Sequence, residues 1–267
     1  MDENYQTYLN RVARLTLPET HESQLQNIQE SPKFQPPSQQ GAERKAVPFP
    51  GYSVITPPWC EDEDTSNGTF YKFLHQTQTQ LLEGLPEDFL VRVVPSSFHL
   101  TLADLIWDGA YRNKSQNPEF EEQLRLSVTN SFKEYAQEHP SIHNNRWQLL
   151  GFMVRPRAIA VCLIPKDETS YKQILQLRRF IYQSPAVVGL GIEQQYHFTA
   201  HITLGYFGNV SDETLGCRQR LYTHLSSLSN QWLEIDSPEL LVHRGEVRKF
   251  DDMTNYYRRP DWGTVEF

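Results

Sequence analysis

Two short stretches of the chain carry the same pairing of an imidazole with a hydroxyl group. Residues 97–102 read SFHLTL and residues 200–205 read AHITLG, and each places a histidine two positions before a threonine. The four residues are His99, Thr101, His201 and Thr203. In an extended strand, side chains two residues apart point to the same face. Each stretch therefore predicts one face that presents a histidine beside a threonine.

Two histidines of this kind are suited to general acid–base chemistry at phosphorus. Displacement at a phosphoester needs one group to take a proton from the nucleophile and another to give one to the leaving oxygen. Imidazole, with an ordinary pKa of about 6.5, can do either near neutral pH. Threonine hydroxyls can donate hydrogen bonds to the non-bridging phosphoryl oxygens, where charge gathers in the transition state. The sequence leaves open which histidine is the acid.

Two further His-x-Thr triplets occur, and neither is equivalent to this pair. His75 precedes Thr77 in a segment of helical periodicity, where residues two apart do not share a face, so we interpret it as structural. His197 precedes Thr199 and, four residues before His201, falls on the same face of an extended strand. It is either an accessory pocket residue or an exposed polar residue. We prefer His201 for the second motif because HITLGY reproduces the HLTL of the first.

The alternative explanation for the repeated pattern is that two half-buried strands turn polar residues to solvent. The positions between the polar residues are apolar and already supply a core-facing set: Phe98, Leu100, Leu102, Ala200, Ile202 and Leu204. The polar faces then carry His and Thr, whereas the residues that commonly solvate a strand are Lys and Glu. The pattern favours a functional site.

The paired apolar-His-apolar-Thr-apolar motifs resemble those of the two-histidine (2H) phosphoesterase superfamily, which includes RNA 2′,3′-cyclic phosphodiesterases of the LigT type. FHLTLADLIW, AHITLGYF and the C-terminal HRGEVRKFDD are similar to a little-characterised cyanobacterial branch of it. The resemblance covers roughly residues 48–267. It implies a bilobal α+β fold in which two pseudo-symmetric antiparallel sheets, flanked by helices, face a central groove. It also implies that the four motif residues are catalytic and that no metal or cofactor is needed.

A phosphoester substrate needs further positive charge, and a nucleobase needs a flat apolar surface. The candidate substrate-binding residues are Tyr206, His197, Trp107, Arg155, Arg157 and Arg244. The family places an aromatic residue at the position of Tyr206. For Trp107 the alternative is a core position, and for the arginines it is a solvated turn. The aromatic and basic tail MTNYYRRPDWGTVEF could cover one edge of a groove.

The resemblance implies a metal-independent phosphoric diester hydrolase. Its substrate would be a cyclic phosphate or 2′-linked phosphodiester of RNA or a nucleotide, and the sequence does not specify it further. The alternative from another functional class is a non-catalytic module that binds a nucleotide or an RNA end in the same groove. A binding module has no need for two titratable groups that face each other, so the intact motifs favour the enzyme.

The composition limits the class of protein. The 267 residues carry a net charge of −8 and a pI of about 5.6, which argues against a protein that coats duplex nucleic acid. The three cysteines are too widely separated for a disulfide framework or a zinc site, and Cys162 lies in an apolar run typical of a core. The acidic run 61–64 is interpreted as a solvated loop. We expect a cytoplasmic protein without a signal peptide or membrane span, which is a monomer.

The chain divides by composition near residue 47. Residues 1–47 are rich in Gln, Ser and Pro after a short amphipathic start, which predicts an arm or linker lying on a domain formed by residues 48–267. Within the domain, strands are expected at 51–56, 89–107, 147–154, 158–164, 196–207 and 239–250. Helices are expected at 70–85, 118–138, 168–182 and 211–228. This order predicts an α+β fold with one helix after each motif strand.

Overall fold

A computed structural model describes residues 2–37, 43–59, 66–139, 144–211 and 214–267. The acidic run 61–64 lies outside the described residues. Among the residues that are described, no helix combines the length and the apolar character that a bilayer crossing requires.

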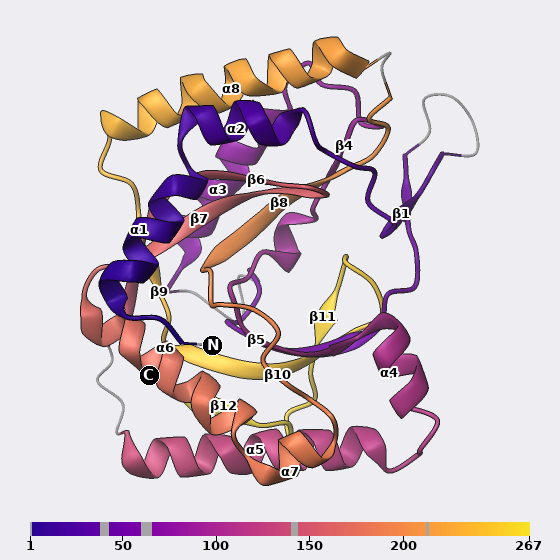
Figure 1. Ribbon diagram of the computed structural model, residues 1–267, viewed down its shortest axis with the longest axis vertical. Coiled ribbons are helices and arrows are strands. Elements are labelled where there is room, and N and C mark those ends of the chain that lie inside the picture. The colour runs from indigo at the N-terminus through magenta and orange to yellow at the C-terminus, as the bar shows by residue number, and fades with distance from the viewer. Residues whose placement is uncertain (1, 38–42, 60–65, 140–143, 212–213) are drawn as a thin grey trace.

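Two five-stranded antiparallel sheets form the centre of the described structure (Figure 1). The first, which we call the β5 sheet, has the order β11 (Tyr256–Tyr257), β10 (Arg244–Phe250), β3 (Gly51–Ile55) and β5 (Thr101–Trp107), with β12 (Thr264–Glu266) also pairing with β10. The second, the β8 sheet, has the order β4 (Leu90–Arg92), β8 (His201–Phe207), β7 (Ala158–Pro165), β6 (Arg146–Arg155) and β9 (Leu240–Leu241). Each sheet therefore contains one of the two motif strands.

Helices cover the outer sides of both sheets (Figure 1). Those over the β8 sheet are α2 (Pro18–Leu25), α3 (Gly68–Leu82) and α8 (Leu215–Leu233). Those over the β5 sheet are α5 (Phe120–Glu138), α6 (Glu168–Tyr182) and α7 (Pro185–Gly189). The remaining elements are α1 (Tyr5–Leu15), the short α4 (Asp108–Lys114), a 3₁₀ turn (Pro95–Ser97) and a two-stranded ribbon of β1 (Phe34–Gln35) and β2 (Lys45–Ala46). The predicted α+β fold with antiparallel sheets is confirmed.

The motif strands are shorter than the sequence pattern indicates. The 3₁₀ turn interrupts the first run at Pro95, as its proline indicated, and β5 begins only at Thr101. The second strand begins at His201, so the prediction that His197 and Thr199 lie in it is wrong. His201 is the first residue of β8, and His99 lies two residues before β5, in a segment whose carbonyls at Phe98 and Leu100 accept backbone hydrogen bonds.

Bulges change the side-chain spacing on both motif strands. On β5, register shifts against β3 leave Thr101, Asp104 and Trp107 half-buried while the pairs of residues between them are buried. On β8, a shift opposite Ile159 and Ala160 similarly brings Tyr206 to the half-buried face of Thr203. A β-bulge adds one residue to one strand, so side chains three apart come to share a face. The bulges therefore extend each motif face to a further side chain.

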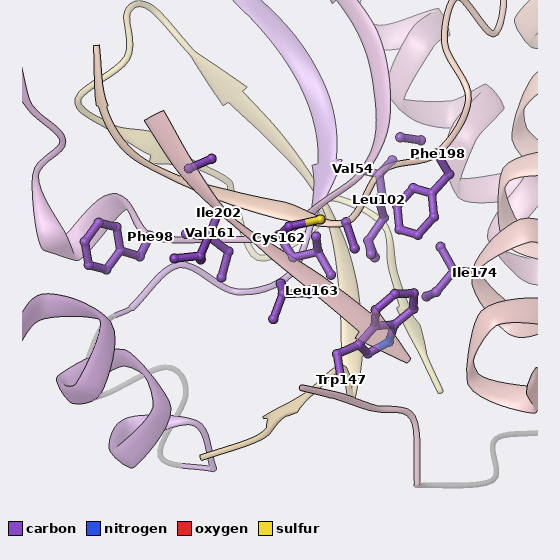
Figure 2. Close-up of a cluster of buried hydrophobic side chains, with 14 of the residues drawn as sticks. Val54, Phe98, Leu102, Trp147, Val161, Cys162, Leu163, Ile174, Phe198 and Ile202 are labelled. Carbon is purple, nitrogen blue, oxygen red and sulfur yellow. The ribbon is translucent and has the colours of Figure 1, made fainter. Parts of the chain in front are cut away.

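The apolar positions of both motifs lie in the core, as the alternation predicted. Phe98, Leu102, Phe198 and Ile202 are at most 5% exposed, and Figure 2 shows them around the buried Cys162. A fully buried side chain of this size stabilises the folded state by about 1.5–3 kcal/mol. Because the core takes these positions, alternation forces the intervening histidines and threonines to the opposite face.

The N-terminal segment packs closely on the domain. Asn4 caps α1 by accepting a hydrogen bond from the backbone N–H of Thr7. Tyr8 and Val12 are fully buried, and the Tyr8 hydroxyl donates to the carbonyl of Leu163 at 3.0 Å. The segment thus contributes side chains to the common core, and the domain boundary at residue 47 stays a prediction.

Candidate active site

A cavity of about 1140 Å³ is lined by residues of both sheets and of the N-terminal segment. All four motif residues line it: His99, Thr101, His201 and Thr203. The charges of the two histidines also interact, since His99 is one of the groups that lower the pKa of His201. The structure therefore brings the two motifs to one cavity.

His99 is held by a hydrogen bond to the backbone two residues before it. Its Nδ1 donates to the carbonyl of Ser97 at 2.7 Å, because a carbonyl can only accept. The proton is thereby placed on Nδ1, and the lone pair on Nε2. The pKa of His99 is lowered to about 4, chiefly by burial and to a smaller extent by the positive charge of Arg248. The ring of Tyr256 lies 4.2 Å away, centroid to centroid.

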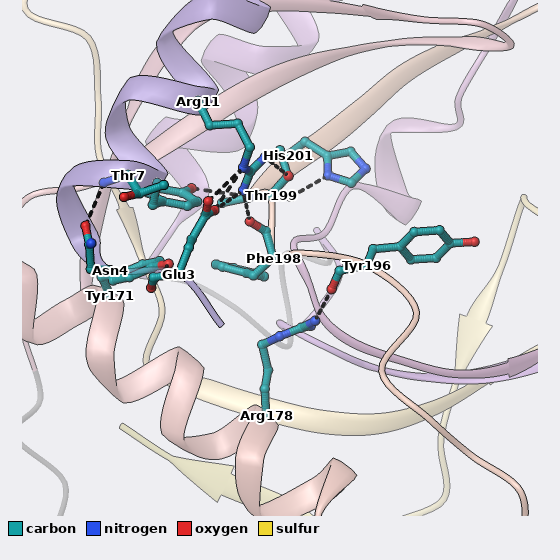
Figure 3. A network of polar contacts seen from close by, with 12 residues as sticks. Glu3, Asn4, Thr7, Arg11, Tyr171, Arg178, Tyr196, Phe198, Thr199 and His201 are labelled. Carbon is teal, nitrogen blue, oxygen red and sulfur yellow. Dashed lines mark hydrogen bonds and ion pairs between the residues drawn. The ribbon is translucent and has the colours of Figure 1, made fainter. Parts of the chain in front are cut away.

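His201 makes the same backbone hydrogen bond through Nδ1 as His99, and a different side chain contacts its Nε2. Its Nδ1 donates to the carbonyl of Thr199 at 2.7 Å (Figure 3). A guanidinium nitrogen of Arg155 lies 2.8 Å from Nε2, and because a guanidinium can only donate, Nε2 is the acceptor. Burial lowers the pKa of His201 to about 4, and Arg155 is the next largest cause. His201 is therefore neutral in this state.

The backbone that positions His201 is itself held by α1 (Figure 3). Arg11 donates to the Thr199 hydroxyl at 2.8 Å and to the carbonyl of Phe198 at 2.6 Å. Its guanidinium also forms an ion pair with Glu3. The N-terminal helix thus fixes the segment whose carbonyl sets the tautomer of His201.

Five of the six predicted substrate-binding residues line the cavity. They are Tyr206, His197, Trp107, Arg155 and Arg157. His197 is exposed, whereas Tyr206 and Trp107 are half-buried. Trp107 stacks on Tyr196 with the ring centroids 6.4 Å apart and the planes at 25°. Neither Trp107 nor Tyr206 is therefore a pure core residue.

Arg244 does not line the cavity, contrary to the sequence prediction. Its guanidinium forms an ion pair with the fully buried Glu246, with 2.8 Å between Nε and Oε1. Arg248 pairs with the same carboxylate at 2.7 Å. The cost of burying a carboxylate requires such partners, so Arg244 is engaged with the interior of its own sheet.

Several cavity residues were missed by sequence reasoning. They are Lys33 of the N-terminal segment, Asp104 of β5 and Tyr196. Tyr256 also lines the cavity, and it belongs to the aromatic tail that the sequence analysis placed at a groove edge. Burial raises the pKa of the Asp104 carboxyl above its usual range, and nearby cations oppose that rise. Asp104 could not be found from a strict period of two, because a bulge turns it to the cavity. Lys33 lies in a segment whose composition predicted no fixed position.

In the described part of the chain, no group of three or more His, Cys, Asp or Glu side chains is arranged to hold a metal ion.

Comparison with known proteins relates the chain to solved structures alone, since neither protein-family models nor curated proteins gave a match. A conserved protein of unknown function from Agrobacterium tumefaciens matches 84% of this chain and 92% of its own at 17% identity, with a TM-score of 0.52. LigT of E. coli complexed with 3′-AMP matches 82% of this chain and 95% of its own at 14% identity, with a TM-score of 0.37. The chain thus shares the fold of the Agrobacterium protein, and membership of the two-histidine phosphoesterase superfamily stays a prediction from the motifs.

Proposed function

We propose that this protein is a metal-independent phosphoesterase that opens a cyclic phosphate or a 2′-linked phosphodiester of RNA or a nucleotide. The observation that carries the proposal is the shared geometry of the two histidines. Each donates Nδ1–H to a carbonyl two residues earlier at 2.7 Å and lines the same cavity. Each Nε2 therefore carries a lone pair, as a general base requires.

The reaction needs one histidine neutral and the other protonated. The neutral imidazole takes a proton from water as its oxygen attacks phosphorus, and the imidazolium gives a proton to the leaving ribose oxygen, whose bond to phosphorus breaks. Burial keeps both groups neutral in the free protein, with pKa values of about 4. A bound phosphate anion favours the charged form, so substrate binding raises these pKa values and supplies the acid.

The other cavity residues support the same chemistry. Thr101 and Thr203 donate to the non-bridging oxygens, where negative charge accumulates. Arg155, which donates to His201 in the free protein, transfers its hydrogen bond to the phosphate. The stacked Trp107 and Tyr196 offer a flat surface to a nucleobase. Sequence composition adds the expectation that the protein acts in the cytoplasm as a monomer.

Turnover of 2′,3′-cyclic nucleotides and 2′–5′ oligonucleotides in the presence of EDTA tests the proposal. We expect His99→Ala and His201→Ala each to lower kcat by about 10³-fold, because each removes a general acid or base. His75→Ala is a matched control from a third His-x-Thr triplet, on α3 and outside the cavity lining, and it should leave kcat unchanged. Activity that survives either motif variant would refute the role of that histidine. Tight binding without any product would favour the non-catalytic module.

A further inference from the structure

Lys33 brings a positive charge from the N-terminal segment into the cavity wall. Its ammonium lies 4.6 Å from the centroid of Phe49 and 5.0 Å from that of Tyr206. Within the described residues, no carboxylate forms an ion pair with it and no side chain hydrogen-bonds to it. The ammonium is therefore held by the faces of two aromatic rings, and its donors point to no fixed acceptor.

A second cation, Arg155, acts on Lys33. Burial is the largest cause that brings the pKa of Lys33 to about 8, Asp104 raises that pKa, and Arg155, a smaller cause, lowers it. Asp104 acts in the opposite direction but forms no ion pair with either cation in the described residues. Two like charges in a partly desolvated cavity repel each other, and an anion between them relieves the repulsion. Lys33, Arg155 and Arg178 all lower the pKa of Asp104, so three cations share this carboxylate, and a further anion would relieve the repulsion among them.

The position of Lys33 differs from that of the scissile phosphate. A phosphoryl group undergoing reaction must reach both motif histidines, whereas Lys33 lies against Tyr206, beyond Thr203 on β8. Its charge is the smallest of the causes that act on His201, and it is absent from those that act on His99. Arg155 contacts His201 at 2.8 Å, and its charge also acts on Lys33.

We propose that Lys33, with Arg155, forms a second anion subsite, and that the substrate is a nucleotide carrying another phosphoryl group besides the scissile ester. The inference rests on the proposed function for the scissile ester. It assigns the N-terminal segment a direct part in substrate recognition. A substrate with two phosphoryl groups also suits a cavity far larger than one cyclic phosphate, at about 1140 Å³.

A purely structural role for the ammonium is a weaker explanation, because the segment is anchored by other contacts. The backbone N–H of Ser31 donates to the carbonyl of Phe207 at 2.8 Å. Phe34 is 7% exposed and packs on Tyr206 with the centroids 5.5 Å apart. The carbonyl of Lys33 accepts from Val47 at 3.0 Å. These contacts stay when the charge is removed, so Lys33→Met should fold normally.

The test is calorimetric binding of adenosine 2′,5′-bisphosphate and adenosine 2′-monophosphate to the full chain. We expect the wild-type protein to bind the bisphosphate about tenfold more tightly, as a charge-assisted hydrogen bond provides. In Lys33→Met the preference should fall below about twofold, and in Lys33→Arg most of it should return, because the charge is restored. The subsite would be overturned if the wild-type protein bound both nucleotides with equal affinity or bound neither. It would also be overturned if Lys33→Met lost the same factor of affinity for both nucleotides.

Steady-state kinetics with two substrates distinguishes a failure of the second anion subsite from a failure of the proposed phosphoesterase function. Adenosine 2′,3′-cyclic phosphate is compared with the same ester carrying a 5′-phosphate. We expect Lys33→Met to raise KM about tenfold for the 5′-phosphorylated ester alone, with kcat unchanged. A bisphosphate preference without turnover of either ester would refute the phosphoesterase while the subsite stands. Turnover of both with the same KM would refute the subsite while the phosphoesterase stands.

Discussion

The two motif halves are alike in their inner contacts and different in what surrounds them. Each histidine donates Nδ1–H to the carbonyl two residues earlier, at 2.7 Å, and burial lowers each pKa to about 4. His99, however, packs against Tyr256 of the C-terminal tail. His201 instead accepts from Arg155, and its backbone support is held by Arg11 of α1.

This difference separates local from tertiary causes. The hydrogen bond that both histidines share joins residues two apart, so a repeated local motif reproduces it, whereas their shared burial depends on the whole fold. The unequal parts come from the N-terminal helix, the β6–β7 turn and the C-terminal tail, which are distant in sequence. Near-symmetry in the hydrogen bonds of the two motif histidines therefore coexists with different neighbours on their other sides.

The threonines test whether the two halves contribute equally. Thr101→Val and Thr203→Val each remove a hydroxyl donor at nearly constant volume, and we expect each to lower kcat by about 100-fold. Steady-state kinetics with a cyclic nucleotide measures this. Thr79→Val, at an exposed position of α3, is the matched control. If one threonine variant keeps full activity, the transition-state contacts are one-sided.

The dependence of rate on pH tests the shared low pKa values. Since each folded pKa of about 4 is below the ordinary 6.5, the protonated acid is scarce in the free protein, and its fraction falls about tenfold per pH unit above 4. We therefore expect kcat/KM to decline with rising pH between 5 and 7. Because bound phosphate raises the pKa of the acid, kcat should hold to a higher pH. A flat kcat/KM over this range would show that the histidines are not desolvated as described.

Replacement of Arg155 should affect the two halves differently. Arg155→Met removes the charge beside His201, so its pKa should rise while that of His99 stays the same, as measured by NMR titration. Loss of the phosphate contact should also raise KM by about tenfold. Arg157→Met changes the neighbouring arginine, which is not among the groups that shift the pKa of His201, and should leave that pKa unchanged. Equal shifts in both histidines would contradict the asymmetry.

The smallest expected effect concerns the support of His201 by α1. Arg11→Met removes the hydrogen bonds to Thr199 and Phe198, and we expect kcat to fall about fivefold through misorientation of the imidazole. Arg14→Met, on the exposed side of the same helix, should have no effect. A fall in melting temperature without any change in kcat would make Arg11 a purely structural residue.

Much of the site follows from sequence because its causes are local. The alternation of apolar residues with His and Thr requires the polar set to leave the core, and the burial of Phe98 and Ile202 confirms it. The α+β fold with antiparallel sheets follows from the order of elements and from the family resemblance. Strand ends were less predictable, because the regular strands begin at Thr101 and His201, whereas the alternating pattern begins earlier.

Other features arise only when distant segments meet. Bulges set by pairing with β3 and β7 bring Asp104 and Tyr206 to the cavity face, which no period of two could reveal. Lys33 is positioned by its contact with Tyr206 of β8. Arg244 forms an ion pair with the buried Glu246 and does not reach the cavity. The reason is physical: side-chain direction along one strand is a local property, whereas charge pairing and desolvation depend on neighbours supplied by the whole chain.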